Sequence, residues 1–359
     1  MKIAAIIDEF SPFTKEHRQF IRQVREKSKA DLLIAVMSGD FLQQGIPAAQ
    51  NKYARAAYAV EAGVDFVIEL PVYCTLSSPD TYAYAAVSML ESLHCIDELY
   101  IACDTKAPGL LFDVARFLFI EPRDYQLRLK AYRSSGMSFY DAQANAVGQY
   151  IEKAKYLLKN PANIFAAEYL RALKRIYSRI RPCFINAPTL SPLGQKDVSA
   201  ANNAYISALL NYELCTARKN MDEIYGGTSI LTESICQRKK DYDSFNSFSA
   251  QLKTPTRSHA NIRRYMLNLI LGVRKADIAI CRLYSFSPYL RVIGCNPDVL
   301  SALDDIRSHT RTPIFLSNFS AWQTTDEKTK LVHADPALVM LSAFDSRAHQ
   351  IYRLAFAEK

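Results

Sequence analysis

The chain has 359 residues, long enough for two domains that each bury a core of their own. Its 49% hydrophobic and 22% charged residues are typical of a globular protein in water and exclude a disordered or fibrous chain. No segment reaches the roughly eighteen uninterrupted apolar residues that span a bilayer. The N-terminus lacks the basic start of a secretion signal, so we expect a cytoplasmic protein without a membrane partner.

The first part of the chain alternates between short apolar runs and helical patterns. Helical periodicity covers residues 15–30 and 51–62, each between two apolar runs rich in Ile, Val and Phe. This alternation predicts a doubly wound α/β domain whose parallel sheet is buried on both faces. The expected strands are Ile3–Ile7, Leu32–Met37, Phe66–Leu70, Leu99–Ala102 and Cys183–Ile185.

The later part of the chain is mostly helical. Helical patterns run from 124 to 177 and from 199 to 214, and the pair Gly226-Gly227 marks a turn or linker, so we expect domains at 1–215 and 216–359. In the second domain, 261–272 is an amphipathic helix with a glycine cap. Short strands at 289–294 and 313–316 flank a helix over 297–309.

The net charge of +8 is unevenly distributed. Residues 1–215 hold 24 Lys and Arg against 22 Asp and Glu, whereas residues 216–359 hold 20 against 14. A basic C-terminal module suits a nucleic-acid partner, because neutralising phosphates supplies affinity that does not depend on sequence. Surface lysines and arginines kept for solubility are the alternative.

The eight cysteines are scattered, without a CxxC pair and without a histidine at ligand spacing. Most lie inside apolar runs, as Cys183 and Cys281 do. We therefore expect buried free thiols and no metal site.

The stretch EFSPFTKEH, Glu9 to His17, follows the first strand and leads into a helix. In an open α/β sheet, ligands bind at the carboxyl ends of the strands, and the free N–H groups of the following helix attract phosphate. Ser11 or Thr14 caps this helix, and His17 in its first turn could donate to a phosphate oxygen. A surface or capping role for His17 is the alternative.

A second stretch, Met37 to Pro71, contains a glycine-punctuated loop, a helix and a strand. Lys52 and Arg55 lie three residues apart near the start of the helix and so share one of its faces. That face could hold polyphosphate or RNA. Its alternative is an ordinary solvated helix face.

Together these stretches resemble the bacterial tRNA(Met) cytidine acetate ligases, within the HxGH nucleotidyltransferase superfamily. EFSPFTKEH is similar to the family's EYNPFHNGH, and MSGDFLQQGIPA with GVDFVIELP is similar to MSGNFxQRGEPA and GxDLVxELP. Residues 162–173 resemble the family's NNILxxEYLKAL, and LKTPTRSHANIRRYMLNLILG resembles LLxxKTxxxTRxRIxRxLLxxLLG. The resemblance is collinear over nearly the whole chain and implies a Rossmann-like nucleotidyltransferase domain.

The resemblance also implies a reaction and a site. Such enzymes activate acetate, or another small carboxylate, with ATP to an acyl-adenylate and transfer the acyl group to N4 of a tRNA wobble cytidine. Mg²⁺ is an expected companion of ATP, and an oligomer is compatible with the family. The implied catalytic residues are His17, Lys52 and Arg55; the ATP-binding residues are Ile7, Asp8, Phe10, Ser11, Pro12, Phe13, Thr14, His17, Phe20, Ala102 and Asn163; and the RNA-binding residues are Lys253, Arg257, Arg263 and Arg264.

Several motif positions depart from the family pattern and leave two alternatives open. Thr14 and Glu16 replace the first His and the Gly of HxGH, and Gln44 replaces an arginine. Asn186-Ala187 stands for Lys-Arg, and residues 199–204 are the only match to SATxIR. The alternatives are a catalytically impaired paralogue that acts as an RNA-binding or interaction protein, and a nucleotidyltransferase with a changed substrate.

Overall fold

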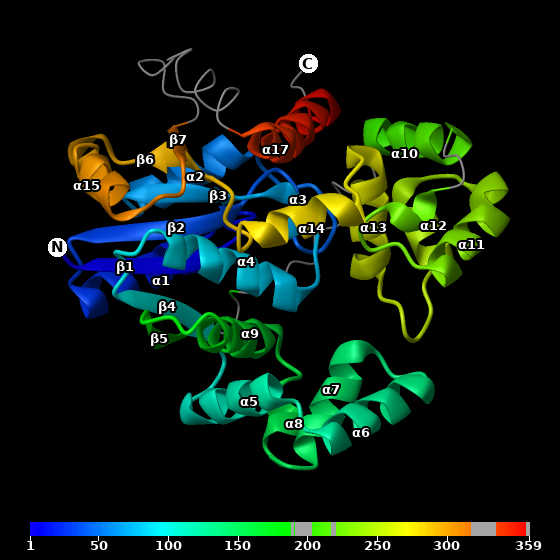
Figure 1. Ribbon diagram of the computed structural model, residues 1–359, viewed down its shortest axis with the longest axis horizontal. Coiled ribbons are helices and arrows are strands. Elements are labelled where there is room, and N and C mark those ends of the chain that lie inside the picture. The colour runs from blue at the N-terminus through cyan, green and yellow to red at the C-terminus, as the bar shows by residue number, and fades with distance from the viewer. Residues whose placement is uncertain (188–189, 191–202, 217–219, 317–334, 357–359) are drawn as a thin grey trace.

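The fold is built on one twisted sheet (Figure 1). A computed structural model describes residues 1–187, 190, 203–216, 220–316 and 335–356. Within these residues the sheet has seven strands in the order β5-β4-β1-β2-β3-β6-β7. The strands are β1 (Ile3–Asp8), β2 (Leu32–Ser38), β3 (Phe66–Leu70), β4 (Glu98–Cys103), β5 (Arg181–Asn186), β6 (Leu290–Cys295) and β7 (Ile314–Leu316).

The predicted α/β class and all seven predicted strands are confirmed, with one qualification. β1 to β5 are mutually parallel, but β6 runs antiparallel to β3, with Ile68 opposite Val292 and Glu69 opposite Arg291. β7 then pairs with β6 in parallel. The sheet is therefore mostly rather than wholly parallel.

Helices cover both faces of the sheet, as a doubly wound fold requires. α1 (Lys15–Ser28) and α2 (Lys52–Glu61) pack on one face, where Phe20, Ile21 and Ala59 meet the side chains of β1 and β2 that point that way. The neighbouring strand residues point to the opposite face and join the larger core, which includes α4 (Pro79–Ser92) and α9 (Pro161–Arg175). Because successive side chains of a strand point to opposite faces, the mostly apolar strands supply both cores.

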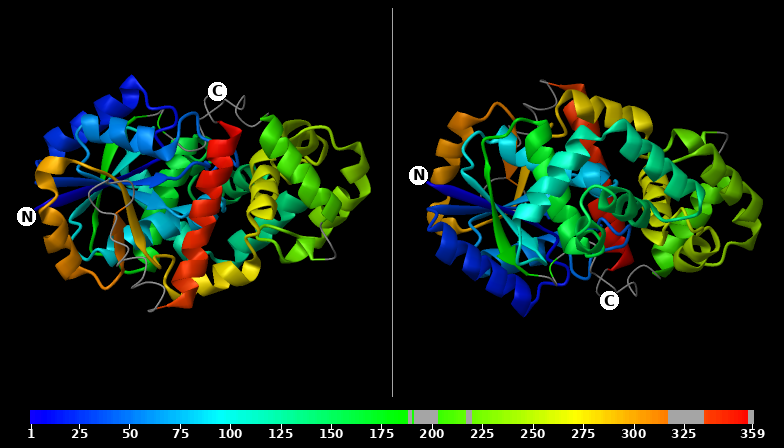
Figure 2. Two further views of the ribbon diagram at one scale, coloured as in Figure 1. Left: turned by 90° about the horizontal axis from the view of Figure 1, so that it is seen from above. Right: turned by 90° about the horizontal axis from the view of Figure 1, so that it is seen from below.

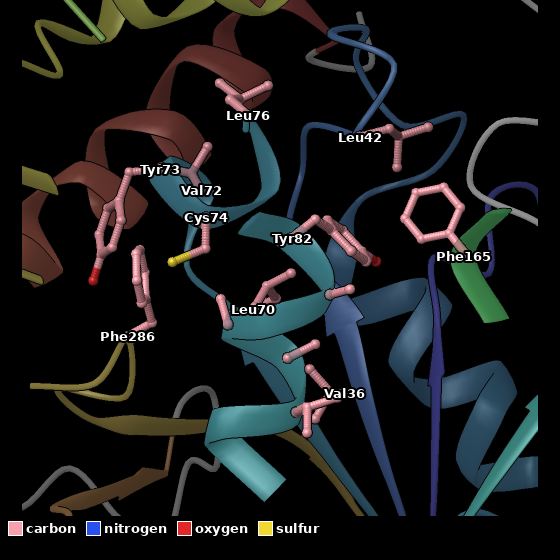
Figure 3. Packing of buried hydrophobic residues seen from close by; sticks show 14 of the residues in the cluster. Val36, Leu42, Leu70, Val72, Tyr73, Cys74, Leu76, Tyr82, Phe165 and Phe286 are labelled. Atoms are coloured by element: carbon pink, nitrogen blue, oxygen red, sulfur yellow. The ribbon is translucent and has the colours of Figure 1, made fainter. Parts of the chain in front are cut away.

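A helical insertion joins β4 to β5 and confirms the helical pattern predicted over 124–177. It comprises α5 (Gly109–Ile120), α6 (Arg123–Ser134), α7 (Phe139–Gly148), α8 (Ala154–Leu157) and α9. α5 packs along α9, while α6 to α8 extend away from the sheet (Figure 1). The T-shaped ring pair of Tyr82 and Phe165, 5.5 Å apart, ties α4 to α9 (Figure 3).

The C-terminal part contributes a second group of helices. They are α10 (Ala204–Thr216), α11 (Ser229–Arg238), α12 (Phe245–Gln251), α13 (His259–Leu271), α14 (Lys275–Leu283), α15 (Ala302–His309) and α17 (Pro336–Ala355). α13 ends at Gly272 in the left-handed conformation, φ 71°, as the glycine cap predicted. α17 lies between the sheet and the helices α10 to α13, and contacts α3 (Val72–Thr75), α10, α13 and α14 (Figure 2).

The boundary expected at residue 215 does not separate two independent bodies. β6 and β7 come from the expected second domain but complete the sheet of the first, because the edge of β3 pairs with β6. The strands predicted at 289–294 and 313–316 are present as β6 and β7, yet β6 pairs with β3, more than two hundred residues earlier in the chain. Local sequence patterns carry no information about such a long-range pairing.

The thiols are also distributed differently from expectation. All eight cysteines are free, but only four are buried, and Cys215 and Cys236 are exposed at the ends of helices. Over the described ranges, no helix combines the length and apolarity needed to cross a membrane.

Candidate nucleotide site

The carboxyl ends of β1 and β4 define the candidate site. After β1 the chain continues to β2 on one side, whereas β4 pairs with β1 on the other side, so the order of strands reverses between β1 and β4. Ligands of open α/β sheets bind at this reversal, outside the carboxyl ends. The turn from Asp8 to Thr14 and the loop after Cys103 border it.

The turn after β1 is shaped by its own hydrogen bonds. The Asp8 carboxylate accepts the Phe10 N–H at 2.8 Å, and Phe10 has φ 48°, a conformation uncommon for a residue with a side chain. Ser11 Oγ accepts the Ala49 N–H at 3.1 Å and so ties the turn to the loop after β2. Thr14 then caps α1 in an extended conformation.

His17 is held in one tautomer and one orientation. Its Nδ1 accepts the Thr14 backbone N–H at 3.0 Å, so the proton of the neutral ring is on Nε2, which lies 3.5 Å from Asp8 Oδ1. The ring stacks on Phe13 and meets Phe10 edge-on, each with centroids 5.6 Å apart. His17 is thus a capping residue and also presents a fixed N–H donor beside the first turn of α1.

Glu16 puts a negative charge at the same helix start. A hydrogen bond with the Thr14 hydroxyl lowers the pKa of the Glu16 carboxyl, so it is ionised near neutrality. A carboxylate here favours the helix through the macrodipole but competes with a phosphate for the same field. Lys15 and Arg18, both exposed, are the cations of this turn, and Arg18 lies over the Phe13 ring at 5.8 Å.

Glu9 is a buried carboxyl that sequence reasoning did not single out. It has no exposed surface, and burial raises its pKa to about 7, although hydrogen bonds from the Gln43 N–H and the Ser38 hydroxyl act to lower it. Those two bonds, at 2.7 and 2.9 Å, reach Oε1, while Oε2 has no partner among the described residues. The signal in the sequence was a glutamate directly after an apolar strand, inside a matched motif.

Lys52 and Arg55 are not on a solvated face. Lys52 is 2% exposed, and its Nζ bonds Glu69 Oε1 at 2.7 Å and lies 3.9 Å from Asp40 Oδ2. Burial acts to lower the pKa of Lys52, but Glu69 and Asp40 outweigh it and raise the pKa. Arg55 is 0% exposed and donates to the carbonyls of Glu9 and Gly39. The alternative of a solvated helix face is therefore wrong, and both cationic groups are satisfied by protein atoms.

Asn163 and Ala102 lie near the same edge of the sheet. The Asn163 side chain accepts the Asp104 N–H at 2.8 Å and donates to the carbonyls of Asp104 and Leu157, both at 3.1 Å. Ala102 is half-buried within β4. Asn163 therefore fixes the loop after β4 against α9. Residues 199–202, which stand for the SATxIR motif, lie outside the described residues.

The expected RNA-binding residues separate into two groups. Lys253 is exposed and Arg257 is half-buried in the loop before α13. Arg264, in contrast, is buried and donates to the Gln43 carbonyl at 3.0 Å, and Arg263 is half-buried. The loop after β2 approaches α13 closely at Gly45, φ 71°, where a Cβ would lie 2.6 Å from the Arg264 nitrogen. Arg264 thus joins the two halves of the chain and is not available at the surface.

The comparisons with known proteins place the chain in a family and agree with its fold. The chain belongs to the HIGH nucleotidyl transferase family, whose sequence profile matches residues 1–190 and 187–359. Similar curated relatives are named tRNA(Met) cytidine acetate ligase. The one from Clostridium kluyveri is 28% identical over 369 residues, covering 88% of this chain and 89% of the relative. The one from Thermoanaerobacter sp. strain X514 is 28% identical over 380 residues, covering 93% of each chain.

A solved structure shows the same fold. The crystal structure of Thermotoga maritima TmcAL bound with alpha-thio ATP superimposes with a TM-score of 0.86 at 23% identity, over all of this chain and 95% of that one. The predicted family resemblance and fold class are thereby confirmed.

The residues at the start of α1 fit the phosphates of a nucleotide. The first N–H groups of a helix have no partner within the helix, and His17 Nε2–H adds a donor beside them. Lys15 and Arg18 supply positive charge in the same turn, whereas Lys52 and Arg55 do not. The backbone N–H groups at the start of α1 and His17 are therefore the main donors available to the phosphates.

Proposed function

We propose that this protein is an ATP-dependent tRNA(Met) cytidine acetate ligase. The observation that supports it most is the N-terminus of α1 with His17 at the strand-order reversal, in a chain that matches relatives of this name over most of their length. The proposed substrates are ATP accompanied by Mg²⁺, acetate, and the wobble cytidine of a tRNA, which would place the protein in the cytoplasm.

The proposed chemistry has two displacements. A carboxylate oxygen of acetate bonds to the α-phosphorus of ATP and pyrophosphate leaves; N4 of the cytidine then bonds to the acetyl carbon, AMP leaves, and N4 releases a proton. In the first step negative charge develops on the phosphate oxygens, where His17 Nε2–H and the N–H groups of α1 would stabilise it. Lys52 and Arg55 act here as positioning residues, because they hold the loop after β2 and the turn at Glu9.

The test is a reconstituted reaction with purified protein, ATP, Mg²⁺, radiolabelled acetate and unmodified tRNA(Met). We expect label in the tRNA, N4-acetylcytidine in its nuclease digest by mass spectrometry, and one AMP released per acetyl group. His17→Asn should lower kcat by about 10²- to 10³-fold, as loss of one fixed donor to developing charge does. The exposed His309 supplies the control, and His309→Asn should leave kcat unchanged.

The impaired paralogue is the second candidate, and the electrostatics of the turn favour it. Asp8 and Glu16 flank the helix start, and in the interior Lys52 pairs with Glu69 while Arg55 donates to backbone carbonyls. In that case the protein would bind tRNA without acetylating it. Calorimetric titration with ATP and Mg²⁺ separates the two, because the ligase requires binding at submillimolar ATP, whereas no heat up to millimolar ATP would contradict the ligase.

A further inference from the structure

The segment from α5 to the first residue of β5 is strongly basic. Residues 109–181 hold thirteen Lys and Arg against six Asp and Glu, an excess of +7 in 73 residues. Residues 216–359 have an excess of +6 spread over 144 residues. Residues 1–215 as a whole do not show this positive excess, because the residues of that part outside 109–181 are acidic.

Around α8 the positive charges gather with an exposed aromatic ring. Lys153, Lys155 and Lys159 are all exposed, and Tyr156 between them is 67% exposed. The Lys159 ammonium lies over the Tyr156 ring, 5.6 Å from its centroid, so the ring is held beside the charges. Within the described residues, none of these three lysines forms an ion pair with a carboxylate. We call these four residues the α8 cluster.

The α8 cluster is connected to the loop after β4, which borders the candidate nucleotide site. Asn160, directly after Lys159, donates to the Asp104 carboxylate at 2.6 Å. Asn163 bonds both Asp104 in the loop after β4 and the carbonyl of Leu157 at the end of α8. α8 is therefore fixed to the loop after β4.

The same insertion also contacts the loop before α13. Arg133 of α6 donates to the Thr256 carbonyl at 3.1 Å and lies over the Phe139 ring at 6.0 Å. Thr256 is next to Arg257 and three residues from Lys253, two of the residues that the sequence predicted to bind RNA. The insertion and that loop are thus neighbours.

We propose that the α8 cluster is the principal RNA contact of this protein, with its lysines on phosphates and a base stacked on Tyr156. Lysines supply phosphate neutralisation, and an exposed tyrosine ring accepts an unpaired base of any identity, a combination typical of contacts to single-stranded loops. The inference rests on the proposed function, because the base to be acetylated lies in the anticodon loop and must reach the site at the carboxyl ends of β1 and β4, beside the loop to which α8 is fixed. The C-terminal residues Lys253 and Arg257 extend the contact, whereas Arg264 does not take part.

The test is tRNA binding by the full-length protein, measured by fluorescence anisotropy at several salt concentrations. The variant Lys153→Gln/Lys155→Gln/Lys159→Gln should make the slope of log K against log salt shallower by about two units and weaken binding about a hundredfold at 0.1 M salt. The matched control is Arg22→Gln/Lys27→Gln/Lys29→Gln, which removes three exposed cations from α1 and should keep the affinity and the slope.

Tyr156 provides a readout that does not involve charge. Tyr156→Ala should weaken binding roughly tenfold without changing the salt slope, and Tyr156→Phe, which keeps the ring, should restore the affinity. Poly-glutamate is titrated in parallel as a probe for an acidic polypeptide. If it bound as tightly as tRNA and Tyr156→Ala had no effect on either, the RNA assignment would be overturned.

The two proposals fail in different ways. If the protein acetylates tRNA and the α8 triple variant binds tRNA like the wild type, the α8 inference is wrong and the ligase function stands. If the protein binds tRNA through the α8 cluster but transfers no acetate, the ligase function is wrong and the α8 inference stands. Absence of tRNA binding by the wild type would overturn both.

Discussion

Glu9 and Glu168 are two carboxyl groups that the fold keeps away from water. Glu9 is 0% and Glu168 5% exposed, and burial raises the pKa of each to about 7 from an ordinary value of 4.5. Between these values the unfolded chain releases a proton that the folded protein keeps. Each glutamate therefore contributes stability that is fully present below about pH 4.5 and is lost as the pH rises through about 7.

We expect Glu9→Gln and Glu168→Gln each to lose less stability between pH 5 and pH 8 than the wild type. The difference should be as much as about 3 kcal/mol per site, because one pKa unit corresponds to about 1.4 kcal/mol and an amide does not titrate. Urea unfolding at both pH values measures it. The exposed Glu26 offers a control, and a decline in Glu9→Gln as steep as that in Glu26→Gln would contradict the prediction.

At the scale of single residues, the sequence located His17 well but not its neighbours. His17 was predictable because its position after a strand, at the start of a helix, decides where its side chain points. The burial of Glu9 was not, because it depends on Ser38 and Gln43, which come from the next loop. Whether such a carboxyl is buried depends on contacts with residues that are distant in the chain.

Among the elements, α2 shows how a buried charge enters the core. The buried residues of α2 are Lys52, Arg55, Ala56 and Ala59, which follow the i, i+3, i+4, i+7 spacing of a core-facing stripe. That spacing was present in the sequence, but because its first two residues are cations, a solvated helix face remained an alternative. The helix itself was predicted correctly, since Asn51 caps it by accepting the Ala54 N–H at 2.9 Å.

We expect Lys52→Met to destabilise the protein by about 3–5 kcal/mol, because it leaves the Glu69 and Asp40 carboxylates buried without their shared cation. Urea unfolding at pH 7 measures the change, and the exposed Lys27→Met should alter stability by no more than about 0.5 kcal/mol. Adding Glu69→Gln to Lys52→Met should recover part of the loss. A single-variant loss below about 1 kcal/mol would show that the network does not need Lys52.

The whole molecule is held together by ionic contacts between its first and last parts. Arg291 of β6 pairs with Glu69 at 3.3 Å and with Asp345 of α17 at 3.1 Å. Asp345 in turn accepts the Val72 N–H at 2.7 Å, and His349 Nδ1 lies 2.8 Å from Asp40. The sequence predicted β3 and β6 but not α17, which carries Asp345 and His349, and it did not show that the chain returns to its own beginning, because periodicity reports only local order.

We expect a fragment of residues 1–215 to lack a cooperative unfolding transition. It would expose the edge of β3, leave Glu69 without Arg291 and remove β6 from its packing against α2. Near-ultraviolet circular dichroism and urea unfolding of the fragment beside the full chain measure this. Native-like dichroism with a sigmoidal transition would restore the boundary at residue 215 as a true domain border.

The pairing of β3 with β6 also determines when, during translation, the edge of β3 can be covered. The partner of β3 leaves the ribosome only after the helical insertion, β5 and the helices α10 to α14 have been made. At about 5–20 residues per second, the 220 residues from Leu70 to Leu290 keep this strand edge open for roughly ten to forty seconds. During that interval the nascent chain carries an unpaired hydrophobic strand, which makes it a client for chaperones that shield strand edges.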